Sequence, residues 1–219
     1  MFIVFIGGPS GGGKTTLANQ LKSGFKSINL DAEILKMDNY YKIRDNTKPR
    51  QNYDTPEAVD LDLLVENLEK LQAGQAIESP LYCFKTSDRL SETEQVKPTD
   101  ILIVEGIFAL LIANCLETSD KIGAYIQPDS YLANIERRAS RDEEERNTSI
   151  EETKRRELKS FVRDGFFNYI ARTRYQADIV IANNAPEDIN SGIHEIITLC
   201  KGRLQQAGQN PESIRQGMH

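Results

Sequence analysis

Residues 8–15 read Gly-Pro-Ser-Gly-Gly-Gly-Lys-Thr and match the pattern G-x-x-x-x-G-K-[ST] in full. An apolar run at residues 2–6 stands directly before this segment, and apolar residues recur at helical spacing after it. In a strand, loop and helix of this kind, the glycines let backbone N–H groups surround a phosphate, and the helix N-terminus adds partial positive charge. The segment therefore predicts an ATP or GTP site at the end of a buried first strand.

The same pattern indicates which side chains should contact the nucleotide. We expect Lys14 to reach the β- and γ-phosphates and to assist catalysis, and we expect the hydroxyl of Thr15 to bind Mg²⁺. ATP and GTP both remain candidates for the phosphate donor. The predicted nucleotide-binding residues are Gly8, Ser10, Gly11, Gly12, Gly13, Lys14, Thr15 and Thr16.

Apolar runs and helical repeats alternate along the chain, which predicts an α/β fold with a parallel sheet flanked by helices on both faces. A β-hairpin at about 76–97 is expected to protrude, and Asp60 is expected to cap the helix that follows it. The stretch from about 137 to 150 is expected to form a helical lid. The expected strands are 2–6, 33–37, 101–104, 123–126 and 179–182, and the expected helices are 15–22, 61–71, 130–141, 150–172 and 188–204.

Length and charge limit the architecture and the partners. The chain has 219 residues without a linker rich in proline, glycine or serine, so we expect a single domain over 1–204 and a polar, flexible tail at 205–219. The net charge is −6, and basic residues alternate with acidic ones instead of forming a stripe. This pattern argues against nucleic acid and anionic membranes as partners and favours a small substrate.

Three cysteines and the apolar stretches bear on location. Cys83, Cys115 and Cys200 have neither paired nor metal-binding spacing, which is typical of reduced thiols. No basic segment precedes the first strand, and the apolar stretch 101–116 is shorter than the roughly 20 residues of a membrane span. We therefore expect a cytoplasmic protein without a membrane-spanning segment.

Two acidic residues are candidates for the catalytic and metal-binding carboxylates. Asp38 comes just after the second expected strand, and Glu105 ends the aliphatic run 101–104. Ligands of parallel sheets bind at the carboxyl ends of the strands, where a carboxylate can accept a proton from an attacking hydroxyl or hold Mg²⁺. Each residue could by itself be an ordinary turn residue, but together with Lys14 and Thr15 they indicate a metal and phosphate site.

Residues 136–146 are rich in arginine and glutamate. Arg138 and Arg141 are three residues apart and share one helical face, whereas we expect Arg137 on the outer face. A solvated helix with salt bridges explains this composition too. The functional interpretation is a lid whose arginines bind the transferring phosphate, because the guanidinium group matches phosphate oxygens.

With these features in place, the chain resembles the uridine kinase (uridine/cytidine kinase) family of the phosphoribulokinase/uridine kinase group over about residues 1–200. The glycine-rich loop is the generic part of the resemblance, and the other motifs are more specific. In chain order they are GGPSGGGKTT, MDNYYK, NYDTPEAVDLDLL, PLYCFKTSDR, ILIVEGIFAL and RRASRDEEER.

The resemblance implies a role for each matching residue. Asp38 would be the base for the ribose 5′-hydroxyl and would share Mg²⁺ with Thr15 and Glu105, while Arg141 and Arg146 would bind phosphates from the lid. Aromatic faces suit a nucleobase, and a carboxylate suits a vicinal diol, while hairpin packing for the tyrosine and a turn before Pro56 for Asp54 are the alternative explanations. The implied substrate-binding residues are Asp38, Tyr41, Asp54, Tyr82, Ser87 and Arg138.

The chain also departs from the family pattern. The Asp and His of the hairpin motif are replaced here by Cys83 and Ser87, whereas Arg89 is retained. The Gly-Arg pair that follows the lid motif is replaced by Asn147-Thr148. Because the spacing after Arg146 differs as well, no partner is assigned to residues near position 157.

The favoured interpretation is phosphorylation of the 5′-hydroxyl of uridine or cytidine by ATP, as in pyrimidine salvage, by a protein that the resemblance implies to be a homo-oligomer, in particular a tetramer. A related kinase that acts on a sugar phosphate or a vitamin precursor is one alternative. A regulatory nucleotide-binding module without catalysis is another. A GTPase switch is disfavoured because the chain lacks an N-K-x-D tetrapeptide.

Overall fold

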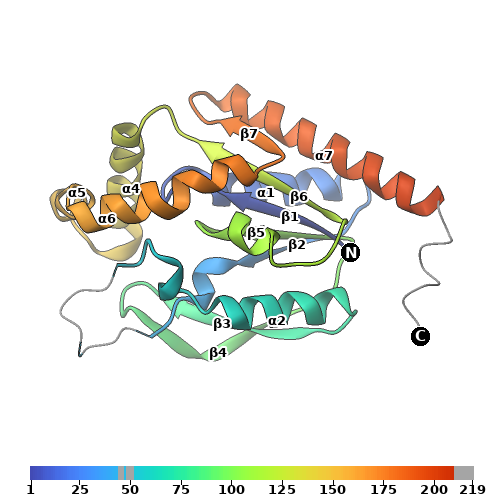
Figure 1. The fold of residues 1–219 in the computed structure, drawn as a ribbon, viewed down its shortest axis with the longest axis horizontal. Helices are drawn as coiled ribbons and strands as arrows, with labels where there is room; N and C mark the ends of the chain where they lie inside the picture. The colour runs from blue at the N-terminus through green and yellow to red at the C-terminus, as the bar shows by residue number, and fades with distance from the viewer. Residues whose placement is uncertain (44–46, 48–51, 210–219) are drawn as a thin grey trace.

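The computed structural model describes residues 1–43, 47 and 52–209, and its centre is a parallel sheet (Figure 1). Five strands pair in the order β2-β5-β1-β6-β7, and every pairing is parallel. The expected α/β fold is confirmed, and the strands lie within two residues of their predicted ends. They are β1 (Phe2–Gly7), β2 (Ala32–Lys36), β5 (Ile101–Glu105), β6 (Lys121–Gln127) and β7 (Ile179–Ala182).

The central strand β1 supplies side chains to two separate hydrophobic clusters. Ile3 and Phe5 belong to one cluster, whereas Phe2, Val4 and Ile6 belong to the other. Side chains alternate between the two faces of a strand, so both faces of the sheet are buried here. This explains why the strand is an unbroken apolar run instead of an alternating one.

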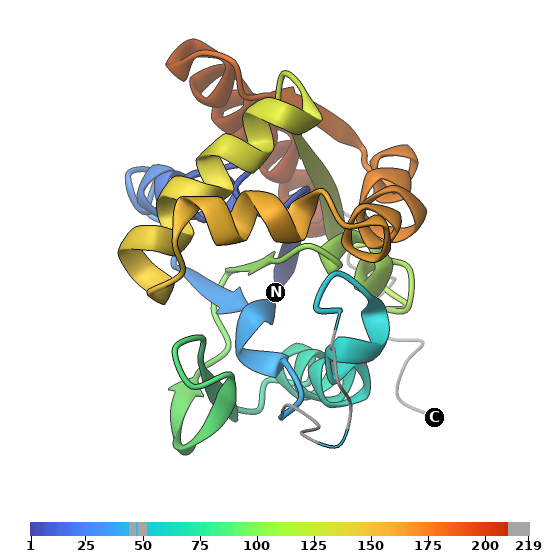
Figure 2. The same ribbon diagram turned by 90° about the vertical axis from the view of Figure 1, so that its left-hand side faces the viewer.

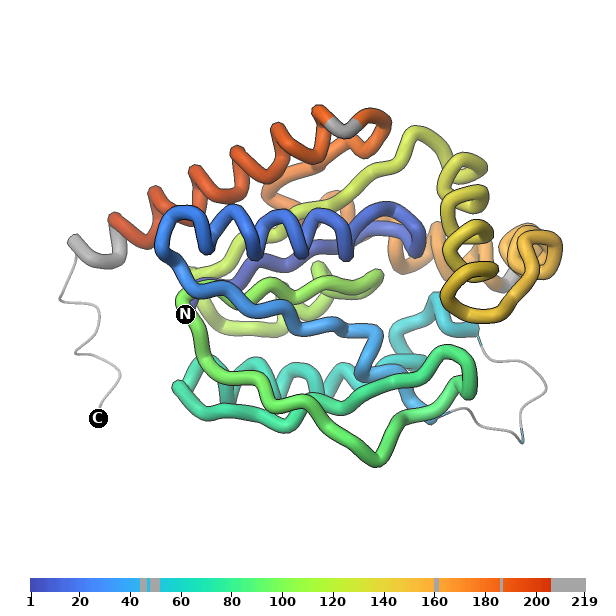
Figure 3. Tube along the Cα trace, turned by 180° about the vertical axis from the view of Figure 1, so that it is seen from behind, coloured from blue at the N-terminus to red at the C-terminus, as the bar shows by residue number. Residues whose placement is uncertain are grey.

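Helices cover both faces. Helices α1 (Lys14–Lys26) and α7 (Pro186–Gln209) lie together on one face, where Leu17 and Ile196 are fully buried in the same cluster (Figures 1 and 3). The short helix α3 (Ala109–Ala113), which the sequence analysis did not foresee, packs on the opposite face.

Below the sheet in Figure 1, helix α2 (Leu61–Gln72) and a two-stranded hairpin form a second layer. The side chain of Asp60 accepts a hydrogen bond from the N–H of Leu63, as expected for the N-cap of this helix. The hairpin consists of β3 (Ile77–Cys83) and β4 (Asp88–Val96), which pair antiparallel within the predicted range. Its tip points toward the edge of the sheet where the strands of the parallel sheet end.

Helix α4 (Tyr131–Arg146) and helix α5 (Ile150–Glu157) stand at this same edge, at the left of Figure 1 and facing the viewer in Figure 2. The Ser130 hydroxyl caps the start of α4 by accepting from the N–H of Ala133. At its end, Asn147 adopts the left-handed conformation with φ of 52°, which stops the helix. Helix α4 therefore continues beyond residue 141, where the periodicity had suggested its end.

The continuous helix expected over 150–172 is wrong. Helix α5 stops at Glu157 and is followed by α6 (Ser160–Gly165), a π-helical turn at Phe166–Ile170 and a 3₁₀ turn at Ala171–Gln176. The breaks let Glu157 reach Arg138 and let Phe166 pack against Tyr131, at a distance of 4.9 Å between ring centroids. Such tertiary contacts outweigh helical propensity.

At the other end of the chain, helix α7 begins two residues before the predicted start at 188 and continues through residues 205–209, which the sequence analysis assigned to the tail. The remaining tail residues, 210–219, lie outside the described residues.

Candidate active site

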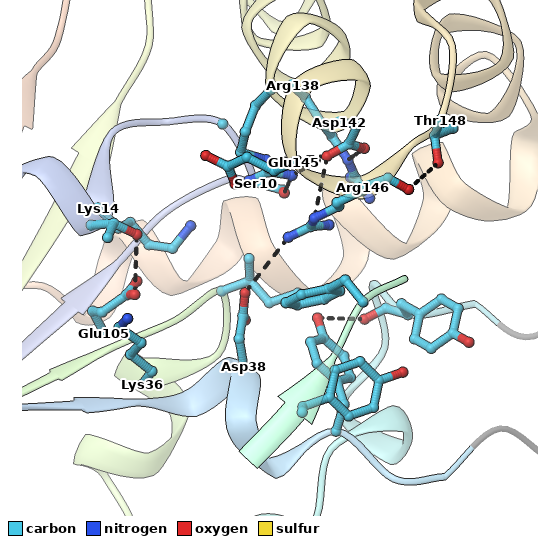
Figure 4. A pocket seen from close by; sticks show the side chains of 18 of the residues that line it. Ser10, Lys14, Lys36, Asp38, Glu105, Arg138, Asp142, Glu145, Arg146 and Thr148 are labelled. Carbon is cyan, nitrogen blue, oxygen red and sulfur yellow. Dashed lines mark hydrogen bonds and ion pairs between the residues drawn. The ribbon is translucent and has the colours of Figure 1, made fainter. Parts of the chain in front are cut away.

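A cavity of about 820 Å³ opens at the carboxyl edge of the sheet, and residues from several parts of the chain line it (Figure 4). They come from the glycine-rich loop and the start of α1, the segment after β2, residues 53 and 54, the hairpin tip, the end of β5, and helices α4 and α5. Fifteen of the seventeen predicted site residues line this cavity. They are Ser10, Gly11, Gly13, Lys14, Thr15, Thr16, Asp38, Tyr41, Asp54, Tyr82, Ser87, Glu105, Arg138, Arg141 and Arg146.

Gly8 and Gly12 are the two predicted residues that do not line the cavity. A Cβ at Gly8, where φ is 137°, would lie 2.6 Å from the carbonyl oxygen of Ile126, so this glycine allows the loop to pack against β6. The N–H of Gly12 donates to the carbonyl of Pro9 at 3.0 Å and is used inside the loop. Both glycines therefore shape the loop from outside the cavity.

The glycine-rich loop leads into the N-terminus of α1, whose first residues, Lys14, Thr15 and Thr16, line the cavity. Gly13, the residue before the helix, has φ of 99°, and no side chain caps the helix there. Because the first N–H groups of a helix lack partners within it, this end is suited to bind an anion. The buried ammonium group of Lys14 donates to the carbonyl of Pro9 at 2.9 Å, and burial lowers its pKa despite the opposing effects of Glu105 and Asp38.

Across from Lys14, the hydroxyl of Thr15 donates to a carboxylate oxygen of Glu105 at 3.1 Å. Burial raises the pKa of Glu105, and the nearby charge of Asp38 raises it further. A buried carboxylate in this setting lacks a cation strong enough to offset its desolvation, although Lys14 and Lys36 lower its pKa in part.

This donor set fits Mg²⁺. The ion prefers oxygen ligands and commonly keeps water while one or two carboxylates and substrate phosphates complete its coordination. Thr15, Glu105 and Asp38 supply such oxygens beside the phosphate loop. Within the described residues, no group of three or more His, Cys, Asp or Glu side chains is placed so that it could hold a metal ion.

Two arginines of α4 lie close to the loop and to the carboxylates, and Figure 4 shows one of them, Arg146, pointing toward Asp38. Arg141 donates to the hydroxyl of Ser10 at 3.1 Å, and Arg146 lies 3.9 Å from a carboxylate oxygen of Asp38. The guanidinium carbon of Arg146 also lies 3.7 Å from the ring centroid of Phe84 at the hairpin tip. Helix α4 thus contacts both the phosphate loop and the hairpin through cationic side chains.

The expectation that Arg137 lies on an outer face is wrong. Arg137 lines the cavity and donates to the carbonyl of Asn183 at 2.9 Å, just after β7. Arg137 and the next residue, Arg138, point to different sides of α4, but other parts of the protein contact both sides. The spacing of residues within α4 gives no sign of the contact between Arg137 and Asn183.

Arg138 lies in a buried network of carboxylates that the sequence analysis identified only in part. Its guanidinium donates to Asp54 at 3.1 Å and lies 3.0 Å from Glu157 and 3.8 Å from Asp142. Burial alone would lower the pKa of Arg138, but these carboxylates outweigh it and raise the pKa. Burial likewise raises the pKa of Glu157, and Arg138 opposes the rise. The sequence analysis missed Glu157, which lies on a separate helix, and Asp142, which lies one turn after Arg138 on the same helix.

Aromatic side chains form the wall of the cavity opposite α4. The ring of Tyr41 lies 5.5 Å from that of Tyr82 and 6.0 Å from that of Phe84, and its hydroxyl donates to the carbonyl of Tyr53. Tyr53 was not predicted, although it stands next to Asp54 in a motif that the sequence analysis singled out. The wall offers aromatic faces close to the Asp54 and Arg138 pair.

Arg89 anchors the hairpin to the rest of the protein. Its guanidinium donates to the carbonyl oxygens of Tyr40 and Tyr41 and to a carboxylate oxygen of Asp60, at 2.9 to 3.1 Å. These contacts lie behind the aromatic wall, so Arg89 acts as a structural brace there.

At the hairpin tip, the two residues that depart from the family pattern both line the cavity. Ser87 has φ of 56°, a left-handed conformation that closes the turn between β3 and β4. Cys83 is half-buried, and the hydrogen bonds with Thr86 lower the pKa of its thiol. Cys115 is exposed and Cys200 is buried, and both lie outside the cavity.

A phosphate-binding loop that faces acidic residues after two other strands, in a parallel sheet, defines a P-loop nucleotide-binding protein, and the adjoining cavity offers room for a second, small substrate. The fold class is that of the P-loop kinases. More particularly, the chain belongs to the Phosphoribulokinase / Uridine kinase family, whose model matches residues 3–190.

Individual comparisons agree with this family. The chain is 38% identical over 209 residues to a uridine kinase of Bacillus pumilus, covering 93% of this chain and 97% of the relative. The structure of a possible uridine kinase from Bacillus stearothermophilus matches with a TM-score of 0.53 at 21% identity, over 82% of this chain and 87% of that one. D-glycerate 3-kinase from Cryptococcus neoformans matches with a TM-score of 0.52 at 17% identity, over 75% and 80%. These two structural likenesses show the fold alone.

A search of the described residues for a membrane-crossing helix finds none that is long and apolar enough.

Proposed function

We propose that the chain transfers the γ-phosphoryl group of ATP to the 5′-hydroxyl of uridine or cytidine. The observation that carries this proposal is the common cavity, which Asp38 lines together with the phosphate loop and the aromatic wall. The identity to a relative named uridine kinase over nearly the whole chain supports the nucleoside as acceptor. The fold by itself is compatible with other acceptors, because a glycerate kinase shares it.

The proposed roles follow from the chemistry of each side chain. The Asp38 carboxylate accepts the proton of the attacking hydroxyl as the new O–P bond forms, and the bond from phosphorus to the bridging oxygen of ADP breaks. Lys14 and the backbone N–H groups of the loop neutralise the β- and γ-phosphate oxygens. Mg²⁺, held by Thr15 and Glu105 with Asp38, would supply further neutralisation of the same oxygens when bound.

The remaining residues hold the acceptor and close the site. Asp54 accepts hydrogen bonds from the ribose hydroxyls, with Arg138 beside it, and the rings of Tyr41 and Tyr82 pack against the base. Arg141 binds the transferring phosphate, as its contact with Ser10 in the loop supports. Arg146 moves from Asp38 to the phosphates when the donor binds. The carboxylate of Asp38 is then free to accept the proton of the acceptor hydroxyl.

Cys83 and Ser87 favour a second candidate, which is a kinase for a different hydroxyl such as that of a sugar phosphate or a vitamin precursor. A Ser side chain at position 87 is shorter than His and both donates and accepts, so a water molecule must bridge it to a pyrimidine. Under the first proposal, this predicts a raised KM and poor discrimination between uridine and cytidine.

An ADP-release assay with purified protein, MgATP or MgGTP, and a panel of nucleosides and sugar phosphates tests both candidates. We expect uridine or cytidine to give the highest kcat/KM. Turnover of another acceptor with no response to any pyrimidine nucleoside would replace the first candidate by the second. Tight nucleotide binding without turnover of any acceptor would instead favour a regulatory module.

The homotetramer remains a proposal that rests on the family resemblance, and the cytoplasmic location remains a proposal that rests on the spacing of the cysteines and the pattern of apolar segments. Sedimentation equilibrium of the purified protein tests the first. Fractionation of the source cells tests the second.

A further inference from the structure

Two asparagines outside the glycine-rich loop each hold one of its carbonyl groups. The amide nitrogen of Asn134, on α4, donates to the carbonyl of Ser10 at 2.9 Å. The amide nitrogen of Asn183, just after β7, donates to the carbonyl of Gly12 at 2.8 Å. Because a carbonyl oxygen only accepts, the contact in each case needs the NH₂ side of the asparagine amide.

These contacts determine where two backbone N–H groups point. In a trans peptide the C=O and the following N–H lie in one plane and point in opposite directions. Holding the Ser10 carbonyl toward α4 therefore turns the N–H of Gly11 away from α4, and holding the Gly12 carbonyl toward β7 turns the N–H of Gly13 away from β7. Neither N–H donates to a partner among the described residues, and both glycines line the cavity.

Both asparagines are themselves fixed. Asn134 is 4% exposed, and its side-chain oxygen has no hydrogen-bond partner in the described part of the chain, so its bonding is confined to the donor side. The backbone N–H of Asn183 donates to the carbonyl of Gln127, and its carbonyl accepts from Arg137 at 2.9 Å. A Cβ added to Gly13 would lie 2.5 Å from the amide nitrogen of Asn183, which shows how closely this side chain approaches the loop.

We propose that Asn134 and Asn183 are positioning residues that orient the N–H groups of Gly11 and Gly13 toward the phosphates of the donor. The proposal rests on the proposed function only in requiring a phosphate donor in this loop, and it is independent of the acceptor. Arg137 supports the second contact by fixing the backbone of Asn183. The loop is thereby preorganised from behind by side chains that do not touch the ligand.

The test replaces each asparagine by leucine, which has nearly the same shape but no hydrogen-bond donor. Calorimetry measures binding of inorganic pyrophosphate and of MgADP to Asn183→Leu and Asn134→Leu. We expect each affinity to fall roughly tenfold, since a misdirected N–H loses a hydrogen bond to a charged group. Asn184→Leu is the matched control, because Asn184 is exposed and its backbone N–H, not its side chain, bonds to Asp188.

Steady-state kinetics distinguish a positioning role from a merely structural one, because a structural defect would not change the KM for ATP selectively. We expect the KM for ATP to rise roughly tenfold in both leucine variants while the KM for the acceptor changes less than about twofold. Unchanged pyrophosphate and MgADP affinity in either folded variant overturns the proposal for that residue, and so does an equal loss in Asn184→Leu. If one variant does not fold, the other still tests the proposal, because the two asparagines hold different carbonyl groups of the loop.

The binding arm also separates this proposal from the proposed function. If wild-type protein binds pyrophosphate but phosphorylates no nucleoside, the acceptor assignment fails and the positioning role is still measured. If wild-type protein binds neither pyrophosphate nor MgADP, both proposals are overturned together.

Discussion

Replacing Arg138 by methionine should destabilise the protein severely even without substrate. The side chain of Arg138 is 16% exposed, and it is paired with Asp54 and Glu157, each of which is 4% exposed. Methionine keeps most of the apolar volume but leaves these carboxylates without their cation. Removing one partner of a buried pair costs about 3–5 kcal/mol, because the remaining charge stays buried and uncompensated. For a chain of this size the loss lowers the unfolding midpoint by roughly 6–20 °C.

Urea and thermal unfolding followed by circular dichroism measure the loss at pH 7.5. Arg155→Met is the matched control, because Arg155 on α5 is 66% exposed and pairs with Glu152 at the surface. We expect the control to change stability by less than about 0.5 kcal/mol. A loss below about 1 kcal/mol for Arg138→Met would refute the argument that the network is buried and coupled.

The pH dependence of Arg138→Met has a definite sign. Burial already raises the pKa of Glu157, and removal of the arginine that opposes this effect raises the pKa further. A carboxyl group whose pKa is higher in the folded state destabilises the fold when it is charged, and protonation relieves the penalty. The stability deficit should therefore shrink as the pH falls from 7.5 to 5.5. Adding Glu157→Gln should recover roughly 1 kcal/mol, because one unpaired buried charge is removed.

Four further predictions concern activity. Lys14→Ala should abolish turnover and weaken triphosphate binding, as measured by calorimetry, because the ammonium group that neutralises the phosphate oxygens is lost. An unchanged affinity for the triphosphate would contradict the proposed role of Lys14 in phosphate binding. Asp38→Asn should lower kcat at least ~10²-fold in the ADP-release assay, which is the lower end for a positioned general base. If this variant kept the turnover of the wild type, Asp38 would be an ordinary turn residue without a catalytic role. Arg141→Lys should lower kcat more than the control Arg155→Lys while the acceptor KM holds, because lysine lacks the planar fork; equal effects would indicate a merely charged helix. Ser87→His should raise uridine kcat/KM by the equivalent of ~1 kcal/mol, and no change would favour the second acceptor class.

The phosphate loop and the sheet could be predicted because their information is local. The spacing of glycines, lysine and threonine within residues 8–15 specifies one loop, and unbroken apolar runs specify strands buried on both faces. The carboxyl ends of parallel strands then bring Glu105 and the segment after β2 to the same edge without further assumptions. The common location of these residues followed from topology.

Contacts between separate elements could not be predicted in the same way. Periodicity over 150–172 extends the helix, whereas the chain breaks after Glu157 so that this residue meets Arg138. Arg137 illustrates the same limit, since helical spacing gives its direction on α4 but not the presence of Asn183 beside it. Such contacts join residues that are far apart in the sequence, and local periodicity carries no information about them.

The brace formed by Arg89 makes the hairpin tip an exchangeable part. Arg89 binds two main-chain carbonyl groups and Asp60, and none of these acceptors depends on the side chains at positions 83 or 87. Substitutions at the tip should therefore change the lining of the cavity without loosening the strands that support it. Under the proposed function, we expect acceptor preference to diverge on this scaffold with little cost in folding, and Cys83 and Ser87 are the positions at which to begin.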